Sequence, residues 1–235
     1  MKNRIWELDA FRGLCVLGMI VIHFVFDLVY LYGLVDWQPS EAFLFVQNWG
    51  GTLFLLLSGV CVTLGSRSVR RGFIVFGAGL LVSAVTWGMY RFGSYPVSII
   101  IYFGVLHCLG VCMLLWPCFQ KLPWWSLVII GVVLVALGLG LKNIHVPYPW
   151  LIPLGVKSEG FASSDYFPLL PNFGFFLLGA AIGKTAYKNK ASLLPDYSRH
   201  AIVRFLTFCG RQSLPIYLLH QPVLNGLLYL LSLLI

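Results

Sequence analysis

Long apolar runs separated by short polar segments dominate the chain. A helix needs about 20 mostly apolar residues to cross the hydrocarbon core of a bilayer. Seven runs come close to or exceed that length, and they predict about seven transmembrane helices. The runs cover residues 10–32, 43–64, 72–89, 97–116, 124–141, 169–186 and 213–234. A short interfacial helix is expected at residues 199–209, before the last span.

The composition supports a polytopic membrane protein. Hydrophobic residues make up 59% of the 235 residues and charged residues 10%, whereas globular proteins have about 45–50% and about 25%. A soluble domain with so few charges could not cover its surface. We therefore expect an all-α membrane helix bundle in which residues 1–235 form a single domain, with membrane lipid and not nucleic acid around it.

The basic residues predict the orientation of the bundle. If the spans alternate, thirteen of the sixteen Lys and Arg residues fall on one side, and only Arg91, Lys142 and Lys157 fall on the other. Cytoplasmic loops carry the excess of Lys and Arg. The pattern therefore places the N-terminus in the cytoplasm and the C-terminus outside.

Ionisable side chains lie within the first predicted span. Arg12 and His23 are eleven residues apart, which is close to three helical turns, so they share one face. Asp27 lies one turn beyond His23 on nearly the same stripe. Such groups are costly in a bilayer and are functional by default. The alternative is a buried structural ladder satisfied by neighbouring helices.

Two further histidines lie within predicted spans. His107 is expected about 15 Å into the fourth span and His220 about 10 Å into the last, so three histidines cluster at mid-bilayer depth. The six cysteines have no CxxC pair and no metal-ligand spacing, and no metal site is predicted. The long connection at residues 142–168 is rich in aromatic residues and proline, and could fold over the bundle or form an interfacial aromatic belt.

Several sequence blocks resemble bacterial relatives of the heparan-alpha-glucosaminide N-acetyltransferase catalytic domain, within a transmembrane acyltransferase superfamily. The blocks occur in order along nearly the whole chain: RIWELDAFRG from Arg4, followed by His23 and Asp27, then FLLLSG from Phe54, FGVLH from Phe103, DYFPLLP from Asp165 and SLPIYLLHQP from Ser213. The resemblance implies an integral protein of the bacterial inner (plasma) membrane. It also implies transfer of an acyl group, usually acetyl, from cytoplasmic acetyl-CoA to a hydroxyl or amine of a sugar or glycan on the other side.

The sequence departs from the lysosomal enzyme of this family in two respects. The lysosomal enzyme is larger, and its catalytic histidine is attributed to the first luminal loop. Here that loop, residues 33–48, contains no histidine. The base must therefore be another residue, and His23 is the natural candidate.

The expected roles follow from acyl-transfer chemistry, which needs a base, an oxyanion donor and close positioning. His23 is the candidate base, oriented by Asp27, and His107 or His220 would donate to the thioester carbonyl oxygen, although which intramembrane histidine is the base stays open. Arginines near the cytoplasmic side are expected to hold the coenzyme A phosphates: Arg12, Arg67, Arg70, Arg71 and Arg211. Substrate contacts are expected from Asp165, Tyr166 and Gln221.

Two other functions remain open at this point. A proton-coupled transporter of small molecules or lipid-linked sugars would also use ionisable groups at mid-membrane, although no internal repeat is evident. A non-catalytic membrane subunit would tolerate replacement of His23. A homo-oligomer is compatible with the sequence.

Overall fold

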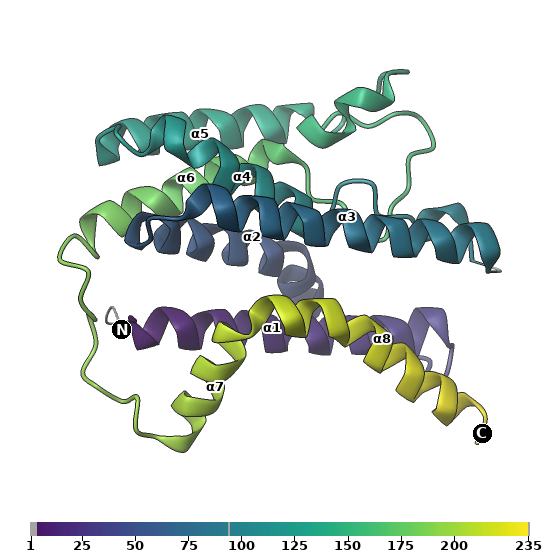
Figure 1. Ribbon diagram of the computed structural model, residues 1–235. Coiled ribbons are helices and arrows are strands. Elements are labelled where there is room, and N and C mark those ends of the chain that lie inside the picture. Colours follow the sequence, from purple (N-terminus) through teal and green to yellow (C-terminus); the bar gives the residue numbers. More distant parts are fainter. Residues whose placement is uncertain (1–3, 94, 235) are drawn as a thin grey trace. The chain divides into compact units, whose positions relative to one another are not determined.

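The computed structural model describes residues 4–93 and 95–234, and these residues are overwhelmingly helical (Figure 1). Within this part of the chain the only β-structure is a pair of isolated bridges, Phe103 with Tyr166 and His145 with Lys157. The α-helices are α1 (Trp6–Phe26), α2 (Glu41–Leu64), α3 (Ser68–Phe92), α4 (Val105–Phe119), α5 (Trp124–Leu141), α6 (Leu169–Thr185), α7 (Ala201–Arg211) and α8 (Ser213–Ser232). A π-helical turn, η1 (Asp27–Leu31), follows α1, and the 3₁₀ turns are η2 (Val97–Ile99) and η3 (Pro149–Leu154).

In the described part of the chain, five helical segments are long and apolar enough to cross a membrane: Trp6–Leu31, Glu41–Leu64, Ser68–Phe92, Trp124–Leu141 and Ser213–Ser232. The fourth and sixth predicted spans give shorter apolar helices, α4 with 15 residues and α6 with 17. At 1.5 Å per residue these reach about 22 and 25 Å, less than the roughly 30 Å hydrocarbon core. The expected short helix before the last span is confirmed as α7.

The chain divides into two compact units. The terminal unit comprises Met1–Phe54 and Lys190–Ile235, and the central unit comprises Leu55–Asn189. Helix α2 contributes residues to both.

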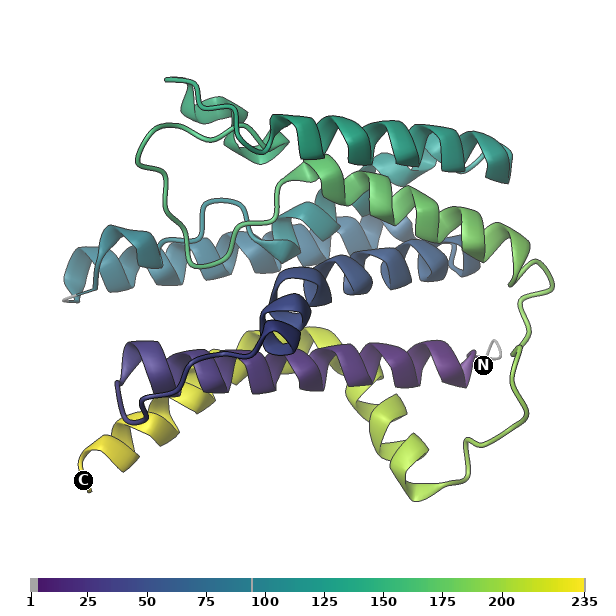
Figure 2. The ribbon, with the colours of Figure 1, turned by 180° about the vertical axis from the view of Figure 1, so that it is seen from behind.

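In the terminal unit, α1 packs against α7 at backbone contact (Figure 2). A Cβ on Gly13 would lie 2.0 Å from the Leu206 carbonyl oxygen, and one on Gly210 would lie 1.8 Å from the Asp9 carbonyl oxygen. Small residues permit this close approach of helices in lipid. Helix α8 also contacts α1 and the π turn, so the two C-terminal helices hold side chains against one face of α1.

In the central unit, the end of α2 crosses α6 in the same way. A Cβ on Gly59 would lie 1.9 Å from the Phe176 carbonyl oxygen, and one on Gly179 would lie 1.9 Å from the Leu56 carbonyl oxygen. The side chains of Leu55, Phe176 and Leu177 are completely buried at this crossing. Helices α3 and α4 pack together, as do α5 and α6.

The predicted continuous span at residues 97–116 is wrong in its first half. Helix α4 begins only at Val105, after the η2 turn and an extended segment. The backbone of this segment is bonded to residues 163–167 and to the α3 side chains of Ser83 and Thr86, and does not form a helix of its own. Hydrogen bonds run from Ser163 Oγ to the Ile100 oxygen (2.8 Å) and from the Phe167 N–H to the Phe103 oxygen (3.0 Å). His107 consequently lies in the first turn of α4, and its expected depth of about 15 Å along a helix no longer follows.

Candidate functional site

The terminal unit contains a cluster of polar side chains between α1, the π turn and α8. His23 belongs to α1 and Asp27 begins the π turn, while His220 and Gln221 lie in α8 with Asn225 one turn further on. The rings of His23 and His220 are in edge contact, with centroids 4.9 Å apart. We call these five residues the histidine cluster. The structure thus brings together four residues that the sequence analysis selected: His23, Asp27, His220 and Gln221.

Main-chain carbonyls fix the tautomer of both imidazoles in this cluster. His23 Nδ1 lies 2.9 Å from the Met19 oxygen, and His220 Nδ1 lies 2.5 Å from the Tyr217 oxygen. A carbonyl oxygen can only accept, so Nδ1 carries the proton in each neutral ring and Nε2 is left as an acceptor. The orienting bond that the sequence analysis gave to Asp27 is therefore made by the Met19 carbonyl, which lies one turn back on the same helix.

Asp27 is buried, with only 3% of its surface exposed. The side chain of Gln221 hydrogen-bonds to its carboxylate, and Gln221 Oε1 in turn accepts from Asn225 Nδ2 at 2.8 Å. Among the described residues, Asp27 Oδ2 and His220 Nε2 have no hydrogen-bond partner. Both atoms are acceptors when the imidazole is neutral, and buried acceptors without partners are rare. The cluster is thus suited to a bound molecule that offers N–H or O–H groups.

The π turn shapes this cluster. The Tyr32 N–H donates to the Asp27 oxygen five residues back, at 2.9 Å, and the Tyr32 hydroxyl donates to the Asn225 main-chain oxygen at 3.1 Å. The wider turn therefore ties the end of the first helical segment to α8. π-Helical turns are rare and are frequent at functional sites.

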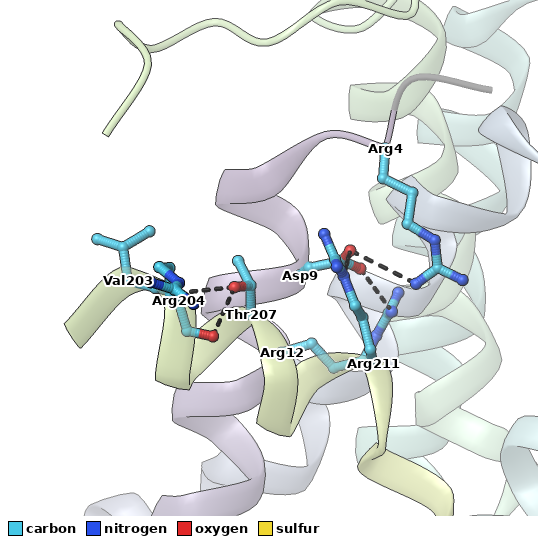
Figure 3. A network of polar contacts seen from close by, with 7 residues as sticks. All are labelled: Arg4, Asp9, Arg12, Val203, Arg204, Thr207 and Arg211. Atoms are coloured by element: carbon cyan, nitrogen blue, oxygen red, sulfur yellow. Dashed lines mark hydrogen bonds and ion pairs between the residues drawn. The ribbon is translucent and has the colours of Figure 1, made fainter. Parts of the chain in front are cut away.

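A second polar group in the terminal unit surrounds Asp9 (Figure 3). Asp9 is buried and pairs with three guanidinium groups. The distances are 3.4 Å from Oδ1 to Arg12 Nη1, 3.2 Å from Oδ2 to Arg211 Nε, and 3.6 Å from Oδ2 to Arg4 Nη1. We call these four residues the Asp9–arginine cluster. Three cations around one carboxylate leave an excess of two positive charges, and each guanidinium keeps further N–H donors for an anion.

Arg12 and Arg211 were expected to act together, and they meet on Asp9. Arg4 was missed as a site residue, although its position five residues before Asp9 was the available signal. The other predicted phosphate ligands, Arg67, Arg70 and Arg71, are exposed at the start of α3 in the central unit. The expected arginine set is therefore divided between the two units.

In the central unit, His107 is almost completely buried, and both ring nitrogens have partners. The Gly104 N–H donates to His107 Nδ1 at 3.2 Å, so Nε2 carries the proton in the neutral ring. His107 Nε2 lies 3.3 Å from Ser83 Oγ, whose hydroxyl donates to the Ile101 oxygen. His107 is thus held as an Nε2 donor, the opposite tautomer to His23 and His220.

Asp165 and Tyr166 fasten the connection between α5 and α6. Asp165 Oδ2 accepts from the Val105 N–H at 3.1 Å and so caps the start of α4. The Tyr166 hydroxyl donates to the Ile152 oxygen at 2.7 Å, and burial raises the pKa of Tyr166 to about 12. The phenol therefore stays a neutral donor at physiological pH. Their expected contact with substrate remains a prediction.

The remaining observations concern metals and relatives. Within residues 4–93 and 95–234, no group of three His, Cys, Asp or Glu side chains could hold a metal ion. A comparison with curated proteins finds no match. A family model described as heparan-alpha-glucosaminide N-acetyltransferase, catalytic, matches residues 4–222. That match covers both units and extends from Arg4 of the Asp9–arginine cluster past Gln221 of the histidine cluster, and the family indicates a membrane acyltransferase. The chain belongs to the heparan-alpha-glucosaminide N-acetyltransferase catalytic domain family.

Proposed function

We propose that this protein transfers an acyl group, in the simplest case acetyl, from cytoplasmic acetyl-CoA to a hydroxyl or amine of a sugar on the outer side of the membrane. The histidine cluster carries the proposal, because it joins two imidazoles with acceptor Nε2 atoms to a buried carboxylate. Acyl transfer to a hydroxyl or amine needs such a base in a water-poor site.

His23 is proposed as the general base. Its Nε2 takes the proton of the acceptor hydroxyl or neutral amine as the acceptor atom attacks the thioester carbonyl carbon. The carbon–sulfur bond then breaks, and the imidazolium returns the proton to the departing sulfur, so coenzyme A leaves as the free thiol. Asp27 stabilises the imidazolium by its charge, while the Met19 carbonyl holds Nδ1 in place.

The sequence left His107 and His220 as equal candidates for the oxyanion donor, and their tautomers differ. Neutral His220 presents an acceptor, which suits a second proton-binding site or a contact to an acceptor hydroxyl. His107 carries its proton on Nε2 and could exchange its contact with Ser83 for a developing oxyanion. On its tautomer alone, His107 stays the proposed oxyanion donor, and within the terminal unit we propose His220 as a positioning partner of His23.

The Asp9–arginine cluster is proposed to hold the coenzyme A phosphates. Its excess positive charge and its forked N–H donors fit phosphate groups. Arg12 and His23 are about 16 Å apart along α1. Phosphate binding and proton transfer would therefore take place at different depths along this helix. Arg67, Arg70 and Arg71 of the central unit are proposed as further phosphate ligands because the Lys and Arg pattern puts them on the cytoplasmic side as well.

The proposal requires a definite arrangement in the membrane. We propose seven spans with the N-terminus in the cytoplasm and the C-terminus outside, in a bacterial inner membrane, with residues 1–235 working as one domain. The distribution of Lys and Arg supports this orientation. It places the Asp9–arginine cluster on the cytoplasmic side, where acetyl-CoA is available.

The proposal is tested with purified protein in lipid nanodiscs, radiolabelled acetyl-CoA and envelope glycans. We expect label on the glycan, loss of transfer in His23→Ala and retention in the control His145→Ala, since His145 is an exposed histidine. If coenzyme A does not bind and no label moves, the acyltransferase is excluded. Proton-coupled solute uptake into proteoliposomes that needs Asp27 would then support the transporter.

A further inference from the structure

A cavity of about 370 Å³ lies in the central unit and contains no residue of the histidine cluster in its lining. Its walls come from residues 97–103 before α4, from the η3 turn and from residues 158–162. This volume lies at the lower end of the range for small-molecule sites, which is about 300–1,000 Å³. The cavity can therefore hold one or two sugar rings or a molecule of similar size.

Aromatic rings form one side of this cavity. The Tyr102 and Phe161 rings are neighbours, with centroids 5.8 Å apart, and both line the space. Tyr102 is 48% exposed although it lies among apolar residues. The electron-rich face of an aromatic ring attracts the polarised C–H groups on the flat face of a pyranose.

Polar groups stand beside these rings. Ser158 and Glu159 line the cavity, and the Phe161 N–H donates to the Ser158 oxygen at 3.1 Å across a tight turn. Gly160 closes that turn with a φ of 70°, a left-handed conformation that favours glycine. The exposed Glu159 carboxylate is an acceptor for hydroxyl or ammonium groups. A purely aliphatic ligand would cover this carboxylate without pairing it, which is unfavourable.

The cavity adjoins the start of α4. Phe103 lines the cavity, and its ring centroid is 5.6 Å from that of His107. The same segment is fastened by Asp165, which caps Val105, and by Tyr166, which holds Ile152 of the cavity wall. A ligand in the cavity is therefore separated from His107 by the Phe103 side chain.

We propose that this cavity binds a sugar ring of the acyl acceptor, with the ring face on Tyr102 and Phe161 and its hydroxyl or amino groups on Glu159. The assignment of the sugar as acceptor rests on the proposed function, whereas sugar binding itself does not require acyl transfer. The mixture of aromatic faces with one carboxylate favours a neutral or amino sugar and disfavours a sulfated or phosphorylated one.

Binding is tested directly by saturation-transfer NMR on the full chain in lipid nanodiscs, with methyl β-glucoside and methyl β-glucosaminide as probes. Nanodiscs avoid alkyl glycoside detergents, whose headgroups would compete. We expect transfer to the ring protons and a loss of about tenfold in affinity in Tyr102→Ala or Phe161→Ala. Glu159→Gln should weaken the amino sugar more than the neutral one. Tyr148→Ala is the matched control, an exposed aromatic of the same connection outside the cavity lining.

A kinetic measurement separates this proposal from the proposed function. In the transfer assay, Tyr102→Ala and Glu159→Gln should raise the acceptor KM several-fold while coenzyme A binding stays unchanged. Sugar binding without any acyl transfer would refute the acyltransferase and leave the sugar site standing. Absence of sugar binding in the wild type, or equal binding in all variants including Tyr148→Ala, would overturn the sugar site.

Discussion

The imidazoles of His23 and His220 meet edge to face, with ring centroids 4.9 Å apart and an interplanar angle of 63°. Each ring donates its Nδ1 proton to a carbonyl of its own helix, at Met19 and at Tyr217. Both Nε2 atoms are therefore left as acceptors, which is what a base that takes up a proton and returns it requires.

Replacing His23 with alanine should reduce acyl transfer by about 10²–10⁴-fold, the usual loss for one general base. Coenzyme A binding should stay within a few-fold of the wild type, because Arg12, a proposed phosphate ligand on the same helix, lies about 16 Å away along α1. Label transfer and calorimetric binding on the same preparation would measure both quantities.

Two further variants test the order of roles in the histidine cluster. Asp27→Asn should reduce transfer less than His23→Ala, since the Met19 carbonyl still orients the ring. His220→Ala should give a loss between the two. If His23→Ala kept near-normal transfer while His220→Ala or His107→Ala abolished it, the base would lie on α8 or α4.

Removing Arg12 or Arg211 should weaken coenzyme A binding by about tenfold or more, the value of a lost charge-assisted hydrogen bond. The affinity of the wild type should also fall with rising salt, since exposed charges are screened. Calorimetry of Arg12→Ala and Arg211→Ala measures the effect. Arg91→Ala is the control, because Arg91 lies at the end of α3, on the predicted outer side. Equal affinity in all three variants would exclude the Asp9–arginine cluster as the phosphate site.

Hydropathy predicted most of the helical content, because burial in lipid demands long apolar helices whatever the tertiary contacts. The run at residues 124–141 coincides with α5, and the run at 43–64 ends with α2. The run at 97–116 failed because a hydropathy window cannot see that Ser163 and Phe167 will bond to its backbone. Apolar residues in a folded-back loop give the same average as residues in a span.

The candidate site was predictable where it depended on local periodicity. Spacing along one helix placed Arg12, His23 and Asp27 on a common face. In the structure His23 and Asp27 contact α8, and Arg12 shares Asp9 with Arg211 of α7. The contact of His23 with His220 joins residues almost two hundred positions apart, and only their similar expected depth suggested it. The π turn at Asp27 could not be predicted, because its sequence pattern is that of an ordinary apolar helix. Arg4 was recognised only as the first residue of the RIWELDAFRG block and was given no place in the site.

Substituting Gly210 with alanine should destabilise the packing of α1 on α7. The new Cβ would lie 1.8 Å from the Asp9 carbonyl oxygen, so the helices must separate. Overpacking of this kind typically costs about 1–3 kcal/mol, and thermal unfolding in nanodiscs should show a lower Tm. Gly18→Ala is the control, since nothing lies within 4 Å of its Cβ position and helix propensity favours alanine by about 1 kcal/mol. If Gly210→Ala had the same Tm as the wild type, α1 and α7 would not be in contact in the membrane.

The proposed seven spans place the C-terminus outside the cytoplasm. Alkaline phosphatase reaches its active fold only in an oxidising compartment outside the cytoplasm. A fusion to the C-terminus should therefore be active in whole bacterial cells. A fusion in the segment between α2 and α3, beside Arg67, should be inactive because the positive residues hold that segment inside. An inactive C-terminal fusion would mean an even number of spans. One of the two short helices, α4 or α6, would then not cross the membrane.

Asp165 offers a test that separates helix capping from substrate binding. Its Oδ2 accepts from the Val105 N–H at 3.1 Å, and an asparagine oxygen can make the same bond. Asp165→Ala should therefore lower the stability of the protein by about 0.5–2 kcal/mol, whereas Asp165→Asn should leave its Tm nearly unchanged. If Asp165 acts only as a helix cap, the acceptor KM should change only in the destabilised variant Asp165→Ala. It should then stay at the wild-type value in Asp165→Asn. A raised acceptor KM in Asp165→Asn at unchanged Tm would show instead that the carboxylate charge contacts the acceptor. Thermal unfolding and acceptor kinetics on the two variants decide between these outcomes.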